Sequence, residues 1–441
     1  MALLPPNGGR SGYGIRPPKW EVFLWLMKQI SIQTINEAAK RLEGVVKKTP
    51  LSYSERLSNE FQAKIYIKRE DLQEVRSYKI RGAYNKMSKL TASEKRRGVV
   101  AASAGNHAQG VAFSAKKLGI KTTIFMPTTT PLQKIARVRE FGNSHVEIRL
   151  FGHTYDEACA EALKFRNNTK GFFVHPFNDE EVIAGQATVG KEIYEELGDS
   201  IDYLICPIGG GGFISGVSSY FSLMSPKTMI IGAEPMGAPS MAESVKRGRI
   251  TELSTIDTFV DGAAVKKPGN ITYEIVKRNV KKIELIPEGQ VCTTMIELYQ
   301  NEGIVAEPAG ALSIAALHNM NEKIKGKTVV CVLSGGNNDI LRYPEVMERS
   351  LVHSGKKHYL LLNFAQKPGQ LREFVNKALG PTDDIVRFEY IKKTSKEKGP
   401  ALVGLEFADK NDYPVLLKKL ESMEINFTVI QHSDLLYNYL I

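Results

Sequence analysis

The first residues that could carry chemistry surround Lys79, in the run SYKIRG at positions 77–82. A single lysine is most often a surface residue. Here the neighbours Tyr78 and Ile80 predict partial burial, and Gly82 permits a close backbone approach. Partial burial lowers the pKa of a lysine ammonium group, which frees the neutral amine that Schiff-base chemistry needs. The segment therefore predicts an amine nucleophile at Lys79.

A second candidate segment, SAGNHAQG at 103–110, follows an apolar strand at 99–102 and opens a helix of small residues. Free backbone N–H groups at a helix N-terminus suit a carboxylate, although an ordinary helix cap is the alternative for the serine. The side-chain amide of Asn106 suits a ring hydroxyl because it offers a donor and an acceptor. The histidine of the run is interpreted as an interior residue without a catalytic role. The predicted carboxylate-binding residues are Ser103, Ala104, Gly105, Asn106 and His107.

Four consecutive glycines, residues 209–212, lie between the apolar strand 203–208 and the helix that begins at Phe213. Glycine loses more conformational freedom on folding than any other residue, so four in a row need a reason. Backbone amides that wrap a phosphate are the usual one, and a flexible turn is the alternative. The spacing matches neither the P-loop nor the dinucleotide G-x-G-x-x-G pattern.

A third strand end carries a hydroxyl group. The run LSGGN at 333–337 closes the apolar strand 328–333 and places Ser334 where its hydroxyl could reach a heterocyclic nitrogen. A serine in an ordinary turn is the alternative. Together the segments supply an amine, an amide, a phosphate cradle and a hydroxyl, which is the contact set of pyridoxal phosphate.

On these motifs, over about residues 33–441, the chain resembles the fold-type II pyridoxal-phosphate enzymes, and most closely the biosynthetic threonine dehydratases. The resemblance implies conversion of L-threonine to 2-oxobutanoate and ammonia, the first step of isoleucine biosynthesis. It also implies that Lys79 forms the Schiff base, Asn106 contacts the ring hydroxyl and Ser334 pairs with the pyridine nitrogen. The residues implied to hold the phosphate are Gly209, Gly210, Gly211, Gly212 and the backbone of Phe213.

The elements that must position these motifs alternate between strand and helix from about residue 33 to 345. Short apolar strands, such as 122–126 and 229–233, are separated by amphipathic helices, such as 154–168 and 180–197. This rhythm predicts parallel sheets covered on both faces, and the number of units requires two such α/β lobes. Ligands bind at the carboxyl ends of the strands in such sheets. Residues 1–32 are expected to form a flexible extension, and 346–356 a linker.

The rhythm changes after residue 356. Strand, helix, two strands, helix and strand follow one another between 358 and 431, which is the βαββαβ order of a ferredoxin-like unit. By resemblance this domain, 357–441, is an ACT-like regulatory domain. It implies isoleucine as an inhibitor, leaves the response to valine open, and is associated with homotetramers.

Two positions depart from the related serine racemases. Ala104 stands where those enzymes carry a serine that acts as a second proton donor, so racemisation is not expected. Glu234 matches one acid of their divalent-cation cluster, but Ser240 stands where a second acid would be. No metal site is therefore predicted.

Composition agrees with a globular enzyme. The 441 residues are 42% hydrophobic and 24% charged, and no stretch reaches the roughly 18 apolar residues of a membrane-spanning helix. The net charge of +11 is spread among acidic residues, so neither nucleic acid nor membrane is an expected partner. The four cysteines are scattered without a C-x-x-C pair, and no signal peptide is evident, which favours the cytoplasm.

Three other functions stay open on sequence alone. A catabolic serine/threonine dehydratase of the same family would share the site. A nucleotide-binding or nucleic-acid-binding protein could use the glycine run and the basic surface. A purely regulatory amino-acid sensor would retain the C-terminal domain without catalysis.

Overall fold

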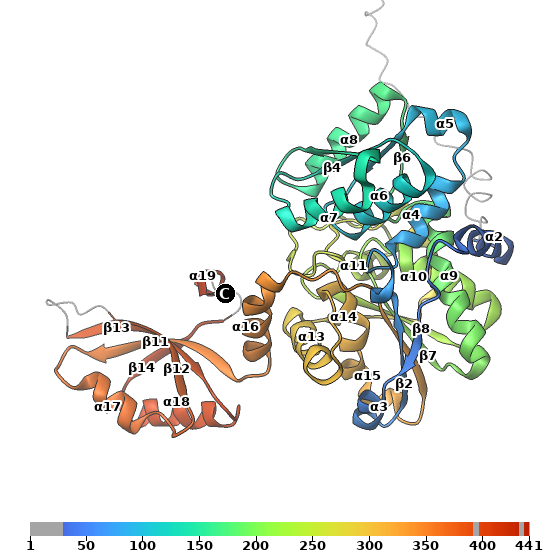
Figure 1. Ribbon diagram of the computed structural model, residues 1–441. Coiled ribbons are helices and arrows are strands. Elements are labelled where there is room, and N and C mark those ends of the chain that lie inside the picture. Colours follow the sequence, from blue (N-terminus) through green and yellow to red (C-terminus); the bar gives the residue numbers. More distant parts are fainter. Residues whose placement is uncertain (1–29, 391–396, 432–435, 441) are drawn as a thin grey trace, which may run out of the picture.

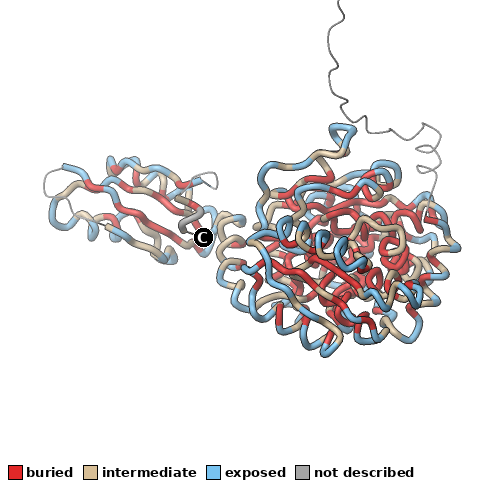
Figure 2. The backbone as a smooth tube through the Cα atoms, turned by 90° about the horizontal axis from the view of Figure 1, so that it is seen from above, coloured by how far each residue is buried: buried red, intermediate tan, exposed pale blue. Residues whose placement is uncertain are grey.

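Three β-sheets organise the chain in this computed structural model, which describes residues 30–390, 397–431 and 436–440. Two of the sheets lie in adjoining α/β lobes, and the third forms a separate C-terminal domain (Figure 1). Buried residues are concentrated in the centre of the lobes and along the sheet of the C-terminal domain (Figure 2). The predicted fold class, with two parallel-sheet lobes and a ferredoxin-like domain, is confirmed.

The large lobe contains a six-stranded sheet in the order β1-β2-β10-β7-β8-β9. Its strands are parallel except for the edge strand β1. The central strands are almost continuously apolar because helices cover both faces of the sheet. The strands are β1 (Leu51–Tyr53), β2 (Lys64–Arg69), β7 (Tyr203–Pro207), β8 (Met229–Pro235), β9 (Lys282–Ile286) and β10 (Thr328–Leu333). The helices of this lobe are α2 (Ile32–Leu42), α3 (Glu55–Phe61), α9 (Glu180–Leu197), α10 (Gly212–Met224), α11 (Ser240–Arg247), α12 (Asn270–Asn279), α13 (Glu288–Glu302), α14 (Pro308–Ala315) and α15 (Leu317–Ile324).

The small lobe contains a four-stranded parallel sheet in the order β5-β4-β3-β6. Helix α4 packs against α6 of this lobe and against α9 of the large lobe, so it lies between the two. The strands are β3 (Val99–Ala102), β4 (Thr122–Met126), β5 (Val146–Leu150) and β6 (Phe172–Phe173). The helices are α4 (Lys79–Ser88), α5 (Ala92–Arg97), α6 (Asn106–Leu118), α7 (Leu132–Gly142) and α8 (Tyr155–Thr169), and short 3-10 turns are η1 (Glu70–Leu72), η2 (Asn143–His145), η3 (Gly198–Ser200) and η4 (Ile340–Arg342).

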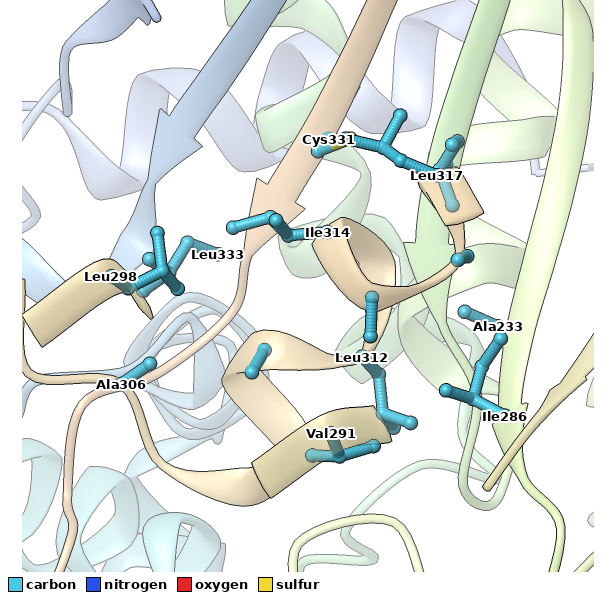
Figure 3. Packing of buried hydrophobic residues seen from close by; sticks show 14 of the residues in the cluster. Ala233, Ile286, Val291, Leu298, Ala306, Leu312, Ile314, Leu317, Cys331 and Leu333 are labelled. Atoms are coloured by element: carbon cyan, nitrogen blue, oxygen red, sulfur yellow. The ribbon is translucent and has the colours of Figure 1, made fainter. Parts of the chain in front are cut away.

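The largest apolar cluster fills the space between the large sheet and helices α13, α14 and α15. Leu312 and Ile314 of α14 lie among side chains of the strands and of α13 (Figure 3). Burial of each such side chain contributes about 1.5–3 kcal/mol relative to exposure. This cluster holds β10 and α14 together, and the candidate site lies where β10 ends and α14 begins.

The C-terminal domain has the predicted βαββαβ order. Its sheet is antiparallel with the order β12-β13-β11-β14, and both helices cover one face (Figure 1). The elements are β11 (Lys357–Ala365), α17 (Gln370–Lys377), β12 (Asp384–Tyr390), β13 (Lys398–Glu406), α18 (Asp412–Ser422), β14 (Asn426–Val429) and a terminal turn α19 (Tyr437–Leu440).

Two of the predicted connecting segments take a more ordered form than expected. Most of the segment predicted as the linker 346–356 belongs to helix α16 (Tyr343–His353), which packs against α13. Val346 of this helix is fully buried in the apolar cluster that also contains residues of α13, so tertiary packing supports the helix. The predicted extension 1–32 lies outside the described residues up to position 29. Ile30, however, is buried and Ile32 begins α2, so the folded part starts before residue 33.

The described residues contain no helix that is both long and apolar enough to cross a membrane. All four cysteines are unpaired, and three of them are buried.

Candidate active site

The four predicted motifs meet where the two lobes face each other. Lys79 is the first residue of α4, and the preceding residue Tyr78 donates its backbone N–H to the carbonyl oxygen of Ser334 at 3.2 Å. The ring of Tyr78 also packs on the ring of Phe213, with centroids 4.4 Å apart. The lysine is thus directly flanked by the end of β10 and by the start of α10.

The amine of Lys79 lies in a position that favours its neutral form. Its Nζ donates to the carbonyl oxygen of Pro176 at 3.0 Å and lies 5.3 Å from the centre of the Tyr78 ring. Burial lowers the pKa of Lys79 to about 8, while the nearby carboxyl of Glu307 acts in the opposite direction. A measurable share of this lysine is therefore unprotonated near neutral pH.

The glycine run 209–212 joins β7 to α10 as predicted. Gly211 has φ +87°, a conformation that other residues rarely adopt, and a Cβ on Gly212 would lie 2.8 Å from the Cβ of Phe177. Gly210 is closed in by the Phe177 ring. The first N–H groups of α10, including that of Phe213, have no intrahelical acceptor and carry the positive end of the helix dipole. The loop therefore has the backbone required for an anion site.

A turn at residues 175–178 connects the lysine to the glycine run and was missed by the sequence analysis. Pro176 accepts from Lys79, and the next residue, Phe177, packs against Gly210 and Gly212. His175 stabilises the turn because its Nδ1 accepts from the N–H groups of Phe177 and Asn178 at 3.2 and 2.9 Å. No local pattern distinguishes this turn from an ordinary loop in the sequence.

The segment 103–107 forms the predicted start of a helix. Ser103 Oγ accepts from the N–H of Gly105 at 3.2 Å, and α6 begins at Asn106. His107 is buried, and its Nε2 contacts the carbonyl oxygen of Val174 at 2.9 Å. Burial lowers the pKa of His107 to about 3, so its ring is neutral and Nε2 is the donor. This supports the interpretation of His107 as an interior histidine.

Asn106 contacts a carboxyl group that the sequence analysis also missed. Its Nδ2 donates to Glu307 Oε1 at 2.6 Å, and its Oδ1 accepts from Asn337 Nδ2 at 2.7 Å. Burial, followed by the charge of Asp261, raises the pKa of Glu307 to about 7. Glu307 lies immediately before α14 and 201 positions from Asn106, so nothing local in the sequence relates the two.

Ser334 lies at the end of β10, as predicted, and is buried. Its hydroxyl donates to the carbonyl oxygen of Ala309 over a long 3.3 Å contact. A hydroxyl held this loosely can rotate towards a better acceptor.

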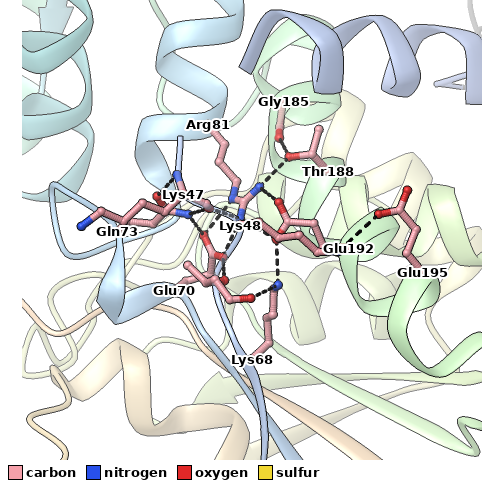
Figure 4. A network of polar contacts seen from close by, with 11 residues as sticks. Lys47, Lys48, Lys68, Glu70, Gln73, Arg81, Gly185, Thr188, Glu192 and Glu195 are labelled. Atoms are coloured by element: carbon pink, nitrogen blue, oxygen red, sulfur yellow. Dashed lines mark hydrogen bonds and ion pairs between the residues drawn. The ribbon is translucent and has the colours of Figure 1, made fainter. Parts of the chain in front are cut away.

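A buried charge network fixes helix α4, which begins with Lys79 (Figure 4). The guanidinium of Arg81 contacts both Glu70 oxygens at 2.8 and 2.9 Å and both Glu192 oxygens at 2.6 and 2.9 Å. Lys68 Nζ completes the network with a 2.7 Å contact to Glu192. Two positive and two negative groups balance, so the network connects α4 to β2 and α9 without a net buried charge.

Glu234 uses both of its oxygens within the protein. They accept the N–H groups of Met241 and Ala242 at 2.8 Å each. Burial raises the pKa of Glu234 to about 8. Within the described ranges, no group of three or more His, Cys, Asp and Glu side chains could hold a metal ion.

Comparison with protein families decides the class. Residues 42–335 match the model of pyridoxal-phosphate-dependent enzymes. The chain belongs to this family. Residues 348–440 match a second model, the C-terminal regulatory domain of threonine dehydratase. The two matches cover the two lobes and the C-terminal domain respectively.

Relatives of this pyridoxal-phosphate enzyme agree with that assignment. The present chain is 51% identical over 415 residues to a protein from Halalkalibacterium halodurans that is described as biosynthetic L-threonine dehydratase IlvA. The match covers 94% of this chain and 100% of that protein. Processed threonine deaminase isoform 2 from Solanum lycopersicum has a similar structure, with TM-score 0.68 and 38% identity over 73% of this chain and 94% of its own. Maize serine racemase has TM-score 0.68 and 30% identity, covering 73% and 98%.

The site residues fit the cofactor of the family. The glycine run provides a phosphate cradle that side chains would fill, Lys79 provides an amine of lowered pKa, and Ser334 provides a hydroxyl. Asn106 still has one side-chain N–H without an acceptor among the described residues.

Proposed function

We propose that this enzyme is a biosynthetic L-threonine dehydratase. It converts L-threonine to 2-oxobutanoate and ammonia with pyridoxal phosphate, supplies isoleucine biosynthesis, and is inhibited by isoleucine. The observation that carries the proposal is that one chain contains both the Lys79 site and a C-terminal domain that matches the threonine dehydratase regulatory domain.

The reaction removes the α-proton and the β-hydroxyl of threonine as water and leaves aminocrotonate. Water then replaces the amino group, so the net products are 2-oxobutanoate and ammonia. Pyridoxal phosphate supplies an electron-accepting ring that stabilises negative charge at the α-carbon. The protein must therefore bind the reacting groups, orient them and move protons.

Lys79 has two roles in this proposal. It would hold the cofactor in the resting enzyme, and its neutral amine would take the α-proton of the bound substrate. The pKa of about 8 suits the second role because the free amine is then a base that works near neutral pH.

The other predicted residues would bind and orient. The backbone of residues 209–213 would hold the phosphate at the N-terminus of α10. Asn106 would contact the ring hydroxyl and Ser334 the ring nitrogen. A neutral hydroxyl at the ring nitrogen does not force a proton onto it, which favours rapid elimination over transamination. The amides of residues 103–107 would bind the substrate carboxylate.

The test of the lysine is a matched pair of variants on helix α4. Lys79→Ala should abolish ammonia release and the visible absorbance of the holoenzyme, because attachment and base are lost together. Lys89→Ala, at the exposed end of the same helix, should retain both. Normal turnover by Lys79→Ala would refute the assigned role.

The regulatory part is tested by titrating the wild-type enzyme with L-isoleucine during ammonia and 2-oxoacid release. L-Isoleucine should inhibit, whereas D-isoleucine, which has the same charges, should not. Activity that is insensitive to L-isoleucine, together with a preference for serine, would favour the catabolic serine/threonine dehydratase. The response to valine, a homotetramer and a cytoplasmic location stay predictions.

The similarity to maize serine racemase provides a second candidate activity. Ala104 opposes it, because a methyl group cannot donate a proton on the side of the substrate that faces away from Lys79. The wild-type enzyme is therefore expected to form no D-serine from L-serine in a chiral assay.

A further inference from the structure

A line of hydrogen bonds runs through the site from a backbone carbonyl to a buried carboxyl group. Asn337 Nδ2 donates to the carbonyl oxygen of Val75 at 2.8 Å and to Asn106 Oδ1 at 2.7 Å. Asn106 Nδ2 in turn donates to Glu307 Oε1 at 2.6 Å. These hydrogen bonds connect the segment that follows β10 with the start of α6 and the start of α14.

The chemistry of the groups fixes the direction of each bond. A backbone carbonyl can only accept, so the atom of Asn337 facing Val75 must be its NH₂ group. The same NH₂ group then faces Asn106, whose nearer atom must be its carbonyl oxygen. The NH₂ group of Asn106 is left to face Glu307, whether or not the carboxyl carries a proton on its other oxygen.

Glu307 accepts a hydrogen bond from one of the two N–H groups of Asn106 Nδ2. The second N–H group has no protein acceptor within the described part of the chain. Without Glu307, the side chain of Asn106 would have an anchor only at its oxygen and could turn about that contact. Glu307 therefore determines where the free N–H points.

Charges around Glu307 connect it to Lys79. Asp261 opposes ionisation of Glu307, and Lys134, which pairs with Asp261 at 2.5 Å, favours it. Arg342 also pairs with Asp261, at 3.6 Å. Ionised Glu307 raises the pKa of Lys79 and also that of the Tyr78 hydroxyl. Removing the charge of Glu307 should therefore make the Lys79 nitrogen lose its proton at lower pH.

We infer that Glu307 is a positioning residue of the active site. It holds Asn106 so that one amide N–H stays available to the cofactor. The inference rests on the roles proposed for Lys79 and Asn106. It predicts that shortening the side chain of residue 307 changes the cofactor affinity, whereas removing its charge changes the pH midpoint of the cofactor absorbance.

The experiment uses resting holoenzyme without substrate and separates these effects with two variants. Glu307→Gln keeps the length and the acceptor oxygen but removes the charge. Glu307→Asp keeps the charge but is shorter by one methylene. Glu302→Gln, at the end of α13 and in a partly buried pair with Arg56, is the matched control. The measurements are the pH titration of the cofactor absorbance bands and the equilibrium dissociation constant for pyridoxal phosphate.

A crossed pattern is expected. Glu307→Gln should shift the absorbance midpoint to lower pH by about one unit or more, with near-normal cofactor affinity. Glu307→Asp should keep the wild-type midpoint but lose about tenfold or more in cofactor affinity, since one misplaced hydrogen bond costs about 1.4 kcal/mol or more. The control should match the wild type in both measurements. If one variant does not fold, the other variant still tests the effect assigned to it, the charge effect for Glu307→Gln or the positioning effect for Glu307→Asp.

Coincident midpoints for Glu307→Gln and wild type would overturn the charge effect, and an unchanged affinity of Glu307→Asp would overturn the positioning effect. Equal loss of affinity in both variants without a midpoint shift would indicate a merely structural role and would also overturn the inference. If the wild type itself shows no visible band and releases no ammonia from threonine, the proposed function fails instead.

Discussion

Gly110 of helix α6 lies directly against the backbone of Lys79. A Cβ at Gly110 would be 3.1 Å from the carbonyl carbon and oxygen of Lys79, a contact with backbone that cannot rotate away. Helices α6 and α4 therefore cross at the residue that carries the amine, and the small side chain of position 110 sets how close they come.

We predict that Gly110→Ala displaces the start of α4. Overpacking of this kind costs about 1–3 kcal/mol of unfolding free energy, and a displaced Lys79 should also bind the cofactor more weakly. Urea unfolding and cofactor titration measure both effects. Gly190→Ala in helix α9 is the control, since its Cβ would meet Val217 at an ordinary 3.4 Å. Identical behaviour of the two variants would contradict the prediction.

A second prediction concerns the glycine run. Gly210→Ala would place a methyl group in the ring of Phe177, so either the loop or the 175–178 turn must move. The affinity for pyridoxal phosphate should fall about tenfold or more, while far-ultraviolet circular dichroism stays that of the folded enzyme. Inorganic phosphate should also protect the variant less than the wild type against thermal unfolding. Wild-type cofactor affinity would show that this backbone does not hold the phosphate.

The lowered pKa of Lys79 predicts how cofactor capture by apoenzyme depends on pH. Only the neutral amine attacks the aldehyde, so the rate rises as the ammonium loses its proton. Because burial lowers the pKa from 10.5 to about 8, the rate should reach half of its maximum near pH 8. Stopped-flow absorbance with apoenzyme measures the profile, and Nα-acetyl-lysine in solution provides the reference with the ordinary pKa. A midpoint close to that of the reference would contradict the burial argument.

The network around Arg81 predicts a large stability effect. Arg81→Met leaves Glu70 and Glu192 in the interior with Lys68 as their remaining cation. Breaking a buried ion pair in this way typically costs about 3–5 kcal/mol. Lys191→Met on the same helix as Glu192 removes an exposed pair with Glu195 and should cost about 1 kcal/mol or less. Urea unfolding with pyridoxal phosphate absent in all samples compares the two, and equal midpoints would contradict the prediction.

Much of the fold could be predicted because its signals are local. Helix 180–197 was predicted with its observed bounds, and the strand 122–126 likewise, since amphipathic or apolar runs define such elements without reference to distant residues. Strands β1, β6 and β9 were not predicted. β6 has two residues, and β1 is a three-residue edge strand, so neither has enough length for a pattern to show.

The candidate site residues were predictable where backbone chemistry demands an unusual sequence. Four successive glycines and an amide at a helix start are such demands, and Lys79 was identified through its neighbours. Glu307, Phe177 and His175 have no comparable local signal, because their importance depends on segments that lie far away in the chain.

The sequence by itself determined the alternation of strand and helix, the position of the glycine run between a strand and a helix, and the βαββαβ order of the C-terminal domain, because each depends on local patterns of residue types. Tertiary structure decided which groups surround Lys79 and how far they shift its pKa. Packing of the two lobes brings Glu307 to Asn106 across 201 positions, and burial then lowers the pKa of Lys79 and raises that of Glu307. Both effects depend on exclusion of water, which no run of residues specifies before the lobes pack together.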